Sequence, residues 1–213
     1  MFITIEGVEG AGKSSVIADA AEFLREVGRE MLITREPGGC ALGKALRAQL
    51  LDSRNTGIAP ETEIFLYLAD RAQHVREVIL PALVLGKVVL CDRFTDSTLA
   101  YQGYGRGRDP DFLRALNEFA TGGLKPDLTL LLDLPAEKGL ARARERNALE
   151  GKAESEGRFE AEELVFHQRV REGFLAIAAL EPRRFALVNV DRPLAEILPE
   201  VRGLLGRRIN FTA

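Results

Sequence analysis

The sequence predicts an α/β fold in which a mainly parallel sheet is surrounded by helices. Five short apolar runs recur along the chain, and stretches with apolar residues at helical spacing lie between them. The runs are near-continuous, which is typical of strands covered on both faces. Alternating strands and helices favour parallel pairing with right-handed crossovers. The expected strands are Phe2–Glu6, Met31–Thr34, Val88–Cys91, Leu128–Asp133 and Phe185–Val190.

Helical stretches fill the intervals between these strands. Ser14–Val27 has an apolar face and stops at Gly28, a typical end signal. Glu61–Leu85 contains Pro81, where we expect a kink or a break. The polar stretch Asn147–Gly157 is expected to be a mobile excursion from a packed domain. The other expected helices are Gly39–Leu51, Thr95–Gly103, Pro110–Ala120, Pro135–Arg146, Glu160–Leu180 and Pro193–Leu205.

Length and composition indicate a single domain, residues 1–213, with a sizeable core. The net charge of −3 argues against a nucleic-acid partner, because such modules are usually strongly basic. No apolar run approaches the ~18 residues of a membrane span, and the N-terminus does not resemble a signal peptide. Cys40 and Cys91 lack metal-type spacing and are interpreted as reduced thiols, Cys91 as a buried one. We therefore expect a cytoplasmic protein without a membrane partner.

The strongest motif is a phosphate-binding loop (P-loop) between the first strand and the first helix. Its pattern is Gly, four residues, Gly-Lys-Ser, and the alternative is a plain glycine turn. Backbone N–H groups and the helix N-terminus would bind nucleotide phosphates, Lys13 would reach the β- and γ-phosphates, and Ser14 would bind Mg²⁺. No guanine-recognition element is present, so a kinase with a small second substrate is favoured over a GTPase. The ATP-binding residues are Gly7, Val8, Glu9, Gly10, Ala11, Gly12, Lys13, Ser14 and Ser15.

Two further strand ends carry polar residues, and ligands in open α/β sheets bind at such ends. TREPGG holds Arg35 and Glu36 beside a tight turn, although an ordinary polar loop is an equal alternative. VVLCDRF ends in Asp92 and Arg93. Asp92 could hold Mg²⁺ and Arg93 could clamp a phosphate, whereas the alternative is a buried structural ion pair.

Two helical segments could line a pocket for a flat ring. Tyr67 and Arg71 share one helix face, and so do Ser97 and Tyr101, with Gln102 adjacent. Without other information, a core tyrosine with a solvated arginine is favoured for the first pair, and an ordinary loop is open for the second. His74 and His167 are interpreted as surface or helix-packing residues.

An arginine-rich stretch precedes and follows the polar excursion. Arg142, Arg144 and Arg146 lie before it, and Arg158 lies beyond it. Most charge runs are solvated helix faces. The functional alternative is a lid whose arginines neutralise charge during phosphoryl transfer.

Taken together and in this order, these segments resemble bacterial thymidylate kinases. The likeness runs over nearly the whole chain through GVEGAGKSS, TREPGG, ADRAQ, CDRF, STLAYQG, KPDLTLLLD and GRFE. It implies the P-loop nucleoside monophosphate kinase fold, a five-stranded parallel sheet surrounded by helices, with a lid at about residues 142–160. It further implies phosphorylation of dTMP to dTDP with ATP and Mg²⁺ in dTTP biosynthesis, by a homodimer.

The resemblance also assigns roles to residues. Tyr67 matches the aromatic residue that stacks on thymine, and Arg71 matches the arginine that bonds the base edge. Tyr101 matches the residue that would crowd a ribose 2′-OH. Asp92 matches the acid near Mg²⁺, so the implied metal-binding residues are Ser14 and Asp92. The implied dTMP-binding residues are Glu9, Arg35, Glu36, Pro37, Tyr67, Arg71, Arg93, Ser97, Thr98, Tyr101 and Gln102.

The expected source of positive charge at the transferred phosphate distinguishes this chain from some members of the family that it resembles. Some relatives carry an arginine directly after the P-loop acid, but here Gly10 follows Glu9, so lid arginines are expected to assist transfer. The lid lacks the acid that often precedes the arginine at Arg158, and it looks longer than usual. We expect direct in-line transfer without a strong general base. The implied catalytic residues are Lys13, Asp92, Arg93, Arg142, Arg146 and Arg158. A kinase for another acceptor and a non-catalytic nucleotide-binding switch are the open alternatives.

Overall fold

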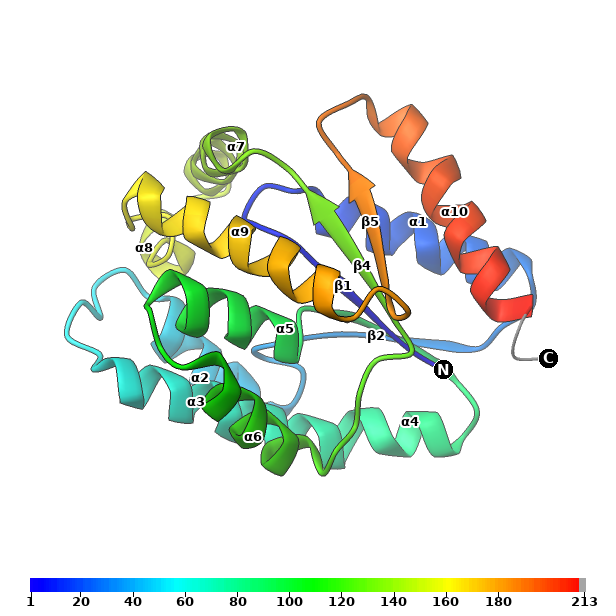
Figure 1. Cartoon of the computed structure of the whole chain (residues 1–213), viewed down its shortest axis with the longest axis horizontal. Coiled ribbons are helices and arrows are strands. Elements are labelled where there is room, and N and C mark those ends of the chain that lie inside the picture. The colour runs from blue at the N-terminus through cyan, green and yellow to red at the C-terminus, as the bar shows by residue number, and fades with distance from the viewer. Residues whose placement is uncertain (211–213) are drawn as a thin grey trace.

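The protein is built on a five-stranded parallel sheet with the strand order β2-β3-β1-β4-β5 (Figure 1). The computed structural model describes residues 1–210, so the last three residues of the predicted single domain lie outside it. β1 pairs with β3 through Ile3 and Leu90, and with β4 through Ile3 and Leu128. The strands are β1 (Phe2–Glu6), β2 (Met31–Arg35), β3 (Val88–Asp92), β4 (Leu128–Asp133) and β5 (Phe185–Asn189). The predicted strands are confirmed, with ends shifted by at most one residue.

Only the three central strands are covered on both faces. Every residue of β1 is buried, and β3 and β4 are buried except at Asp92 and Asp133, which end them. The edge strands β2 and β5 are largely half-buried or exposed, with Ile33 at 50% and Leu187 at 54% exposure. The expectation that helices cover both faces was wrong for these two strands. Each lies at an edge of the sheet and pairs with a single neighbouring strand, so its side chains are more open to solvent.

Helices cover both faces of the sheet (Figure 1). The expected helices are present, and Pro110 begins one with Asp109 as its N-cap. Among the described residues, no helix combines the length and hydrophobicity needed to cross a membrane. The α-helices are α1 (Lys13–Glu26), α2 (Ala41–Leu51), α3 (Pro60–His74), α4 (Leu80–Val84), α5 (Thr95–Thr98), α6 (Pro110–Thr121), α7 (Ala136–Leu149), α8 (Ala153–Glu156), α9 (Leu164–Leu180) and α10 (Leu194–Asn210).

Two predicted helices change their hydrogen-bond pattern midway. The predicted helix Glu61–Leu85 is α3 followed by a π-helical turn, Val75–Ile79, and then α4. Pro81 falls in the first turn of α4, where its missing N–H costs little. The helix therefore adjusts before the proline instead of breaking at it. A second π-helical segment, Leu99–Gly105, continues α5.

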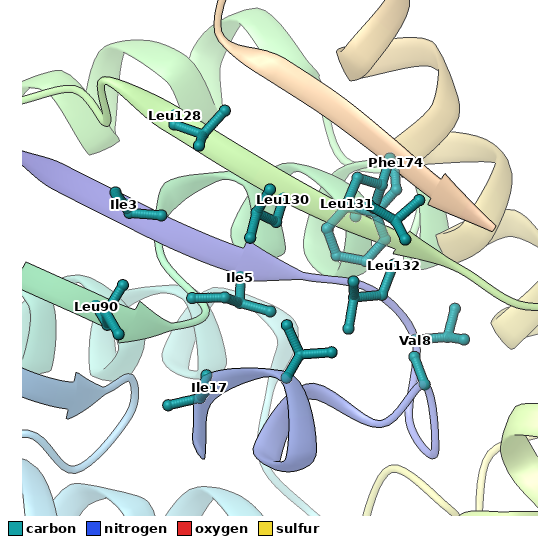
Figure 2. Packing of buried hydrophobic residues seen from close by; sticks show 14 of the residues in the cluster. Ile3, Ile5, Val8, Ile17, Leu90, Leu128, Leu130, Leu131, Leu132 and Phe174 are labelled. Atoms are coloured by element: carbon teal, nitrogen blue, oxygen red, sulfur yellow. The ribbon is translucent and has the colours of Figure 1, made fainter. Parts of the chain in front are cut away.

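The core forms around the central strands. Figure 2 shows Ile3 and Ile5 along β1, with Ile17 of α1 below Ile5, and Leu131 of β4 near Phe174 of α9. All five side chains are at most 7% exposed. The central strands are thereby fixed between helices, and their carboxyl ends become rigid supports for the loops that follow.

The polar excursion is more structured than expected. α7 extends to Leu149, and α8 lies within the stretch predicted to be irregular. The Ser53 N–H donates to the Glu154 carbonyl at 2.8 Å, and the Arg158 N–H donates to the Leu51 carbonyl at 3.1 Å. Backbone hydrogen bonds therefore join the lid segment, residues 142–160, to the end of α2.

Candidate active site

The P-loop connects β1 to α1 in a conformation that needs its glycines. Gly10 has φ +69°, and a Cβ there would lie 2.2 Å from the carbonyl oxygen of Gly139 on α7. The Lys13 ammonium donates to the carbonyls of Gly7 and Val8 at 3.1 and 2.9 Å. Removal from water, helped by the charge of Arg93, lowers the pKa of Lys13 to about 8. The loop holds this lysine at the start of α1, where backbone N–H groups are free to bind anions.

A cavity of about 510 Å³ opens beside the P-loop and gathers most of the predicted site residues. Among those residues, Gly7, Val8 and Arg158 do not line it. The predicted residues that do are Glu9, Gly10, Ala11, Gly12, Lys13, Ser14, Ser15, Arg35, Glu36, Pro37, Tyr67, Arg71, Asp92, Arg93, Ser97, Thr98, Tyr101, Gln102, Arg142 and Arg146. Segments far apart in the sequence therefore line one cavity.

Glu9 is the centre of a charged cluster in this cavity. Its Oε1 accepts from Tyr101 Oη at 2.5 Å and from the Arg93 guanidinium at 3.2 Å. The His167 Nδ1 lies 3.5 Å from the other oxygen, Oε2. Burial opposes ionisation, but His167, Arg93, Lys13 and Tyr101 together hold the pKa of Glu9 well below its usual range. Glu9 is therefore an ionised acceptor facing the cavity.

Arg93 is fixed by an unusual backbone conformation. Its φ is +69°, in the left-handed region that a non-glycine residue rarely adopts. Glu6 holds the next residues, accepting from the Phe94 N–H at 2.7 Å and from the Ser97 hydroxyl at 2.6 Å. Glu6 is fully buried, and burial with the Asp96 charge raises its pKa to about 7. Sequence reasoning assigned Glu6 only to a strand, although an acid directly before a P-loop was a usable signal.

Arg71 is the most fully engaged arginine of the site. Its guanidinium donates to Glu36, Thr98 and the Phe94 carbonyl at 2.8, 2.8 and 3.0 Å, and to Asn117 at 2.6 Å. The side chain is 2% exposed, so the alternative of a solvated arginine is wrong. Four of the five guanidinium N–H groups are committed, which leaves one for a ligand in the cavity.

His74 belongs to the same buried network. Its Nδ1 lies 2.8 Å from Glu36 Oε1, and its Nε2 lies 2.6 Å from Thr34 Oγ1. Neither His74 nor His167 is a surface residue, because both are at most 1% exposed. Sequence reasoning missed their polar roles, since a histidine on a helix face carries no signal about its distant partners. Glu36 is thus positioned by one histidine and one arginine of α3.

The lid segment divides its basic residues between two directions. Arg142 and Arg146 line the cavity, and so does Lys152, which sequence reasoning missed. Arg158 does not line it: its Nε donates to the Leu50 carbonyl at 2.6 Å, and its guanidinium forms an ion pair with Glu63. The structure therefore brings two of the three predicted lid arginines to the P-loop side.

The predicted magnesium-binding residues fit a nucleotide-bound cation. Asp92 Oδ1 is buried at the cavity and finds no hydrogen-bond partner among the described residues, and Ser14 lines the same cavity. Within residues 1–210, no three His, Cys, Asp or Glu side chains cluster as a metal centre. Mg²⁺ in kinases takes few protein ligands and many phosphate oxygens, so one acid and one hydroxyl suit it.

Comparison with known proteins gives the family. The family model described as thymidylate kinase matches residues 5–201. The chain belongs to the thymidylate kinase family. It is 58% identical over 205 residues to the thymidylate kinase of Desulfovibrio desulfuricans, covering 96% of this chain and 94% of the relative. It is 59% identical over 201 residues to that of Nitratidesulfovibrio vulgaris, covering 94% of each.

A solved structure agrees with this assignment. The crystal structure of thymidylate kinase from Ehrlichia chaffeensis matches with a TM-score of 0.75 and 32% sequence identity, over 96% of this chain and 98% of that one. The predicted nucleoside monophosphate kinase fold is confirmed. Membership of a thymidylate kinase family also confirms that the chain is a kinase, hence a transferase of nucleotide biosynthesis.

Proposed function

We propose that this kinase phosphorylates dTMP to dTDP, with ATP as donor and Mg²⁺ as cofactor, by direct in-line transfer. The observation that carries the proposal is the single cavity shared by the P-loop, Tyr67 and Arg93. A phosphate donor, a flat ring and an acceptor phosphate can therefore bind within one cavity. The family gives dTMP as the acceptor.

The acceptor pocket is the part of the cavity lined by Glu36, Tyr67, Arg71, Tyr101 and Gln102. Tyr67 can stack on a pyrimidine, and the one uncommitted N–H of Arg71 can donate to a base carbonyl. Tyr101 lies against Glu9, where its ring would crowd a ribose 2′-OH. Arg35, Pro37, Ser97 and Thr98 line the same cavity.

The transfer step depends on charge neutralisation. The acceptor phosphate is already an anion, so no strong general base is required. Arg93 holds that phosphate while Lys13 and the P-loop N–H groups hold the donor phosphates. If the transition state is metaphosphate-like, a lid arginine contributes about 10³-fold or more to turnover. Arg142 and Arg146 have this role here.

Ser14 and Asp92 would hold Mg²⁺ together with the phosphates. The ion would supply positive charge that offsets the phosphate oxygens. Asp92 is the last residue of β3, and Arg93 follows it directly. The same strand end would therefore position the cation and the arginine that holds the acceptor phosphate. The orphaned Asp92 Oδ1 supports this assignment.

A homodimer and a single cytoplasmic domain complete the proposal. Phe65 of α3 is 62% exposed, and Phe112 and Phe119 of α6 are 61% and 89% exposed. α3 and α6 pack together, so these rings offer an apolar face that a second copy could cover. Phe119→Glu should shift the protein to monomer in sedimentation velocity, whereas Leu187→Glu on β5 should not.

The experiment is ADP production from ATP and Mg²⁺ with dTMP, dUMP, CMP, AMP, thymidine or no acceptor. A strong preference for dTMP is the expected result. Turnover of another acceptor would keep the kinase and discard the assigned roles of Tyr67, Arg71 and Tyr101. Absence of turnover in a folded protein that binds ATP would overturn the proposal in favour of a nucleotide-binding switch.

A further inference from the structure

Glu63 of α3 is a buried acid at which three segments meet. It is 1% exposed, and it lies one helical turn before Tyr67. Its Oε1 accepts from Gln102 at 2.9 Å and from Arg106 at 2.7 Å. Its Oε2 accepts from Arg106 at 3.1 Å and pairs with Arg158 of the lid segment. A buried carboxylate that accepts from this many donors has a fixed orientation, and it fixes the orientation of its partners.

Arg158 connects the lid segment to the body of the protein by three bonds. Its N–H donates to Leu51 at 3.1 Å, its Nε donates to Leu50 at 2.6 Å, and its guanidinium pairs with Glu63. The side chain is 10% exposed. These bonds hold the C-terminal end of the lid segment against α2 and α3 while Arg142 and Arg146, at its N-terminal end, line the cavity.

Glu63 also contacts the acceptor pocket. Gln102 lines that pocket and is 2% exposed, and its amide nitrogen donates to the Glu63 oxygen that Arg106 also contacts. A ligand that fixes the orientation of the Gln102 side chain therefore also fixes Glu63, which pairs with Arg158 of the lid segment. The lid segment fixes the orientation of Glu63 in turn, through Arg158.

We propose that Glu63 and Arg158 are positioning residues that couple occupancy of the acceptor pocket to closure of the lid segment. Arg158 then acts by fixing the lid, and Arg142 and Arg146 provide the charge at the transferred group. Energetic coupling between sites is reciprocal, so the acceptor should tighten donor binding by the same factor as the donor tightens acceptor binding. The inference rests on the proposed function in taking dTMP as the acceptor.

The test is the affinity for a non-hydrolysable ATP analogue with Mg²⁺, measured by calorimetry with and without dTMP. The full chain is compared with Arg158→Gln, which removes the lid partner of Glu63 and leaves the buried acid with Arg106. We expect Arg158→Gln to bind the analogue alone as the unmodified protein does, and to lose most of a coupling of about tenfold. Arg158→Lys, which restores the charge, should recover part of it.

Limited trypsin digestion provides the second readout, without any nucleotide. The Arg146 and Lys152 side chains are already exposed, but trypsin cleaves only a locally unfolded backbone, and release of the lid segment favours such unfolding. Cleavage there should therefore be about tenfold faster in Arg158→Gln, because protection follows the population of the open form. Arg144→Gln is the matched control. Among the described residues, its guanidinium donates to the Glu160 carbonyl, which is itself part of the lid segment, so coupling and protection should be retained.

The outcomes separate the possibilities. Arg158→Gln with unchanged coupling and unchanged protection would overturn the proposal. A fall in kcat with coupling and protection both unchanged would also overturn the proposal. Arg158 would then be assigned to stabilising charge in the transition state. Failure of the unmodified protein to bind dTMP would contradict the proposed function instead, and the digestion of the nucleotide-free protein would still decide whether Arg158 holds the lid.

Discussion

Tyr101 donates its phenolic hydroxyl to Glu9 at 2.5 Å, so this tyrosine and the acid of the P-loop form one hydrogen-bonded unit. Tyr101→Phe keeps the ring and removes this bond. We expect the KM for dTMP to rise about ten- to a hundredfold, as for one hydrogen bond to a charged group, while the preference for deoxyribose is retained. Steady-state kinetics with dTMP and its ribose counterpart provide the measurement.

Tyr101→Leu separates the two roles of this residue. Loss of the ring should also weaken discrimination against the ribose form and lower the thermal stability, because Phe159, Phe166 and Phe174 all contact the Tyr101 ring edge to face. Equal discrimination in both variants would mean that the ring does not contact the sugar.

Lys13 should make nucleotide binding depend on pH in the alkaline range. Its pKa in the free protein is lowered to about 8, and bound phosphates favour the protonated form. Binding therefore takes up a proton, about half a proton per site at pH 8, and affinity falls as pH rises above that value. Calorimetry in buffers of different ionisation enthalpy measures the uptake. An uptake of zero from pH 7 to 9 would contradict the lowered pKa.

Gly139 should be intolerant of a side chain. A Cβ there would lie 2.5 Å from the Glu9 carbonyl oxygen and 3.1 Å from the side chain of Val8. Gly139→Ala should destabilise the protein by about 1–3 kcal/mol, because α7 must move away from the P-loop. Gly203→Ala is the matched control in α10, where the new methyl group meets nothing closer than 3.6 Å. It should stabilise by about 0.5–1 kcal/mol in urea unfolding.

The lid arginines that face the cavity should act on turnover. Arg142→Ala and Arg146→Ala should each lower kcat by about 10³-fold with little change in the KM for dTMP, because charge develops on the transferred group only in the transition state. Arg114→Ala, which removes an exposed ion pair with Asp111 on α6, is the control. A tenfold loss in dTMP affinity with normal kcat would instead assign these arginines to acceptor binding.

The sequence predicted those features whose signals are local. An apolar run between two helical patterns defines a strand, and Gly7 to Ser14 can be read as a P-loop without knowledge of the fold. The buried ion pairs could not be predicted in this way. Glu63 and Arg158 are 95 residues apart in the chain, and each alone resembles an ordinary surface charge.

Resemblance to a family fills only part of that gap. It assigned Tyr67 and Arg93 to an acceptor site, and both residues line the cavity, although their roles there stay predictions. For Arg158 it implied a catalytic role, whereas its contacts in the structure are with Leu50 and Glu63. The orientation of a long, flexible side chain depends on acceptors supplied by other segments, and a motif does not contain them.

The close approach of Gly10 to Gly139 limits which evolutionary routes are open to this enzyme. Relatives of the animal type carry an arginine at the position of Gly10, but here any side chain would collide with the Gly139 carbonyl. A single substitution would damage the P-loop before it could deliver charge. An arginine at position 10 would fit only if α7, which also carries Arg142, first moved away from the P-loop. We therefore expect Gly10, Gly139 and the arginines of α7 to change together in evolution and not one at a time.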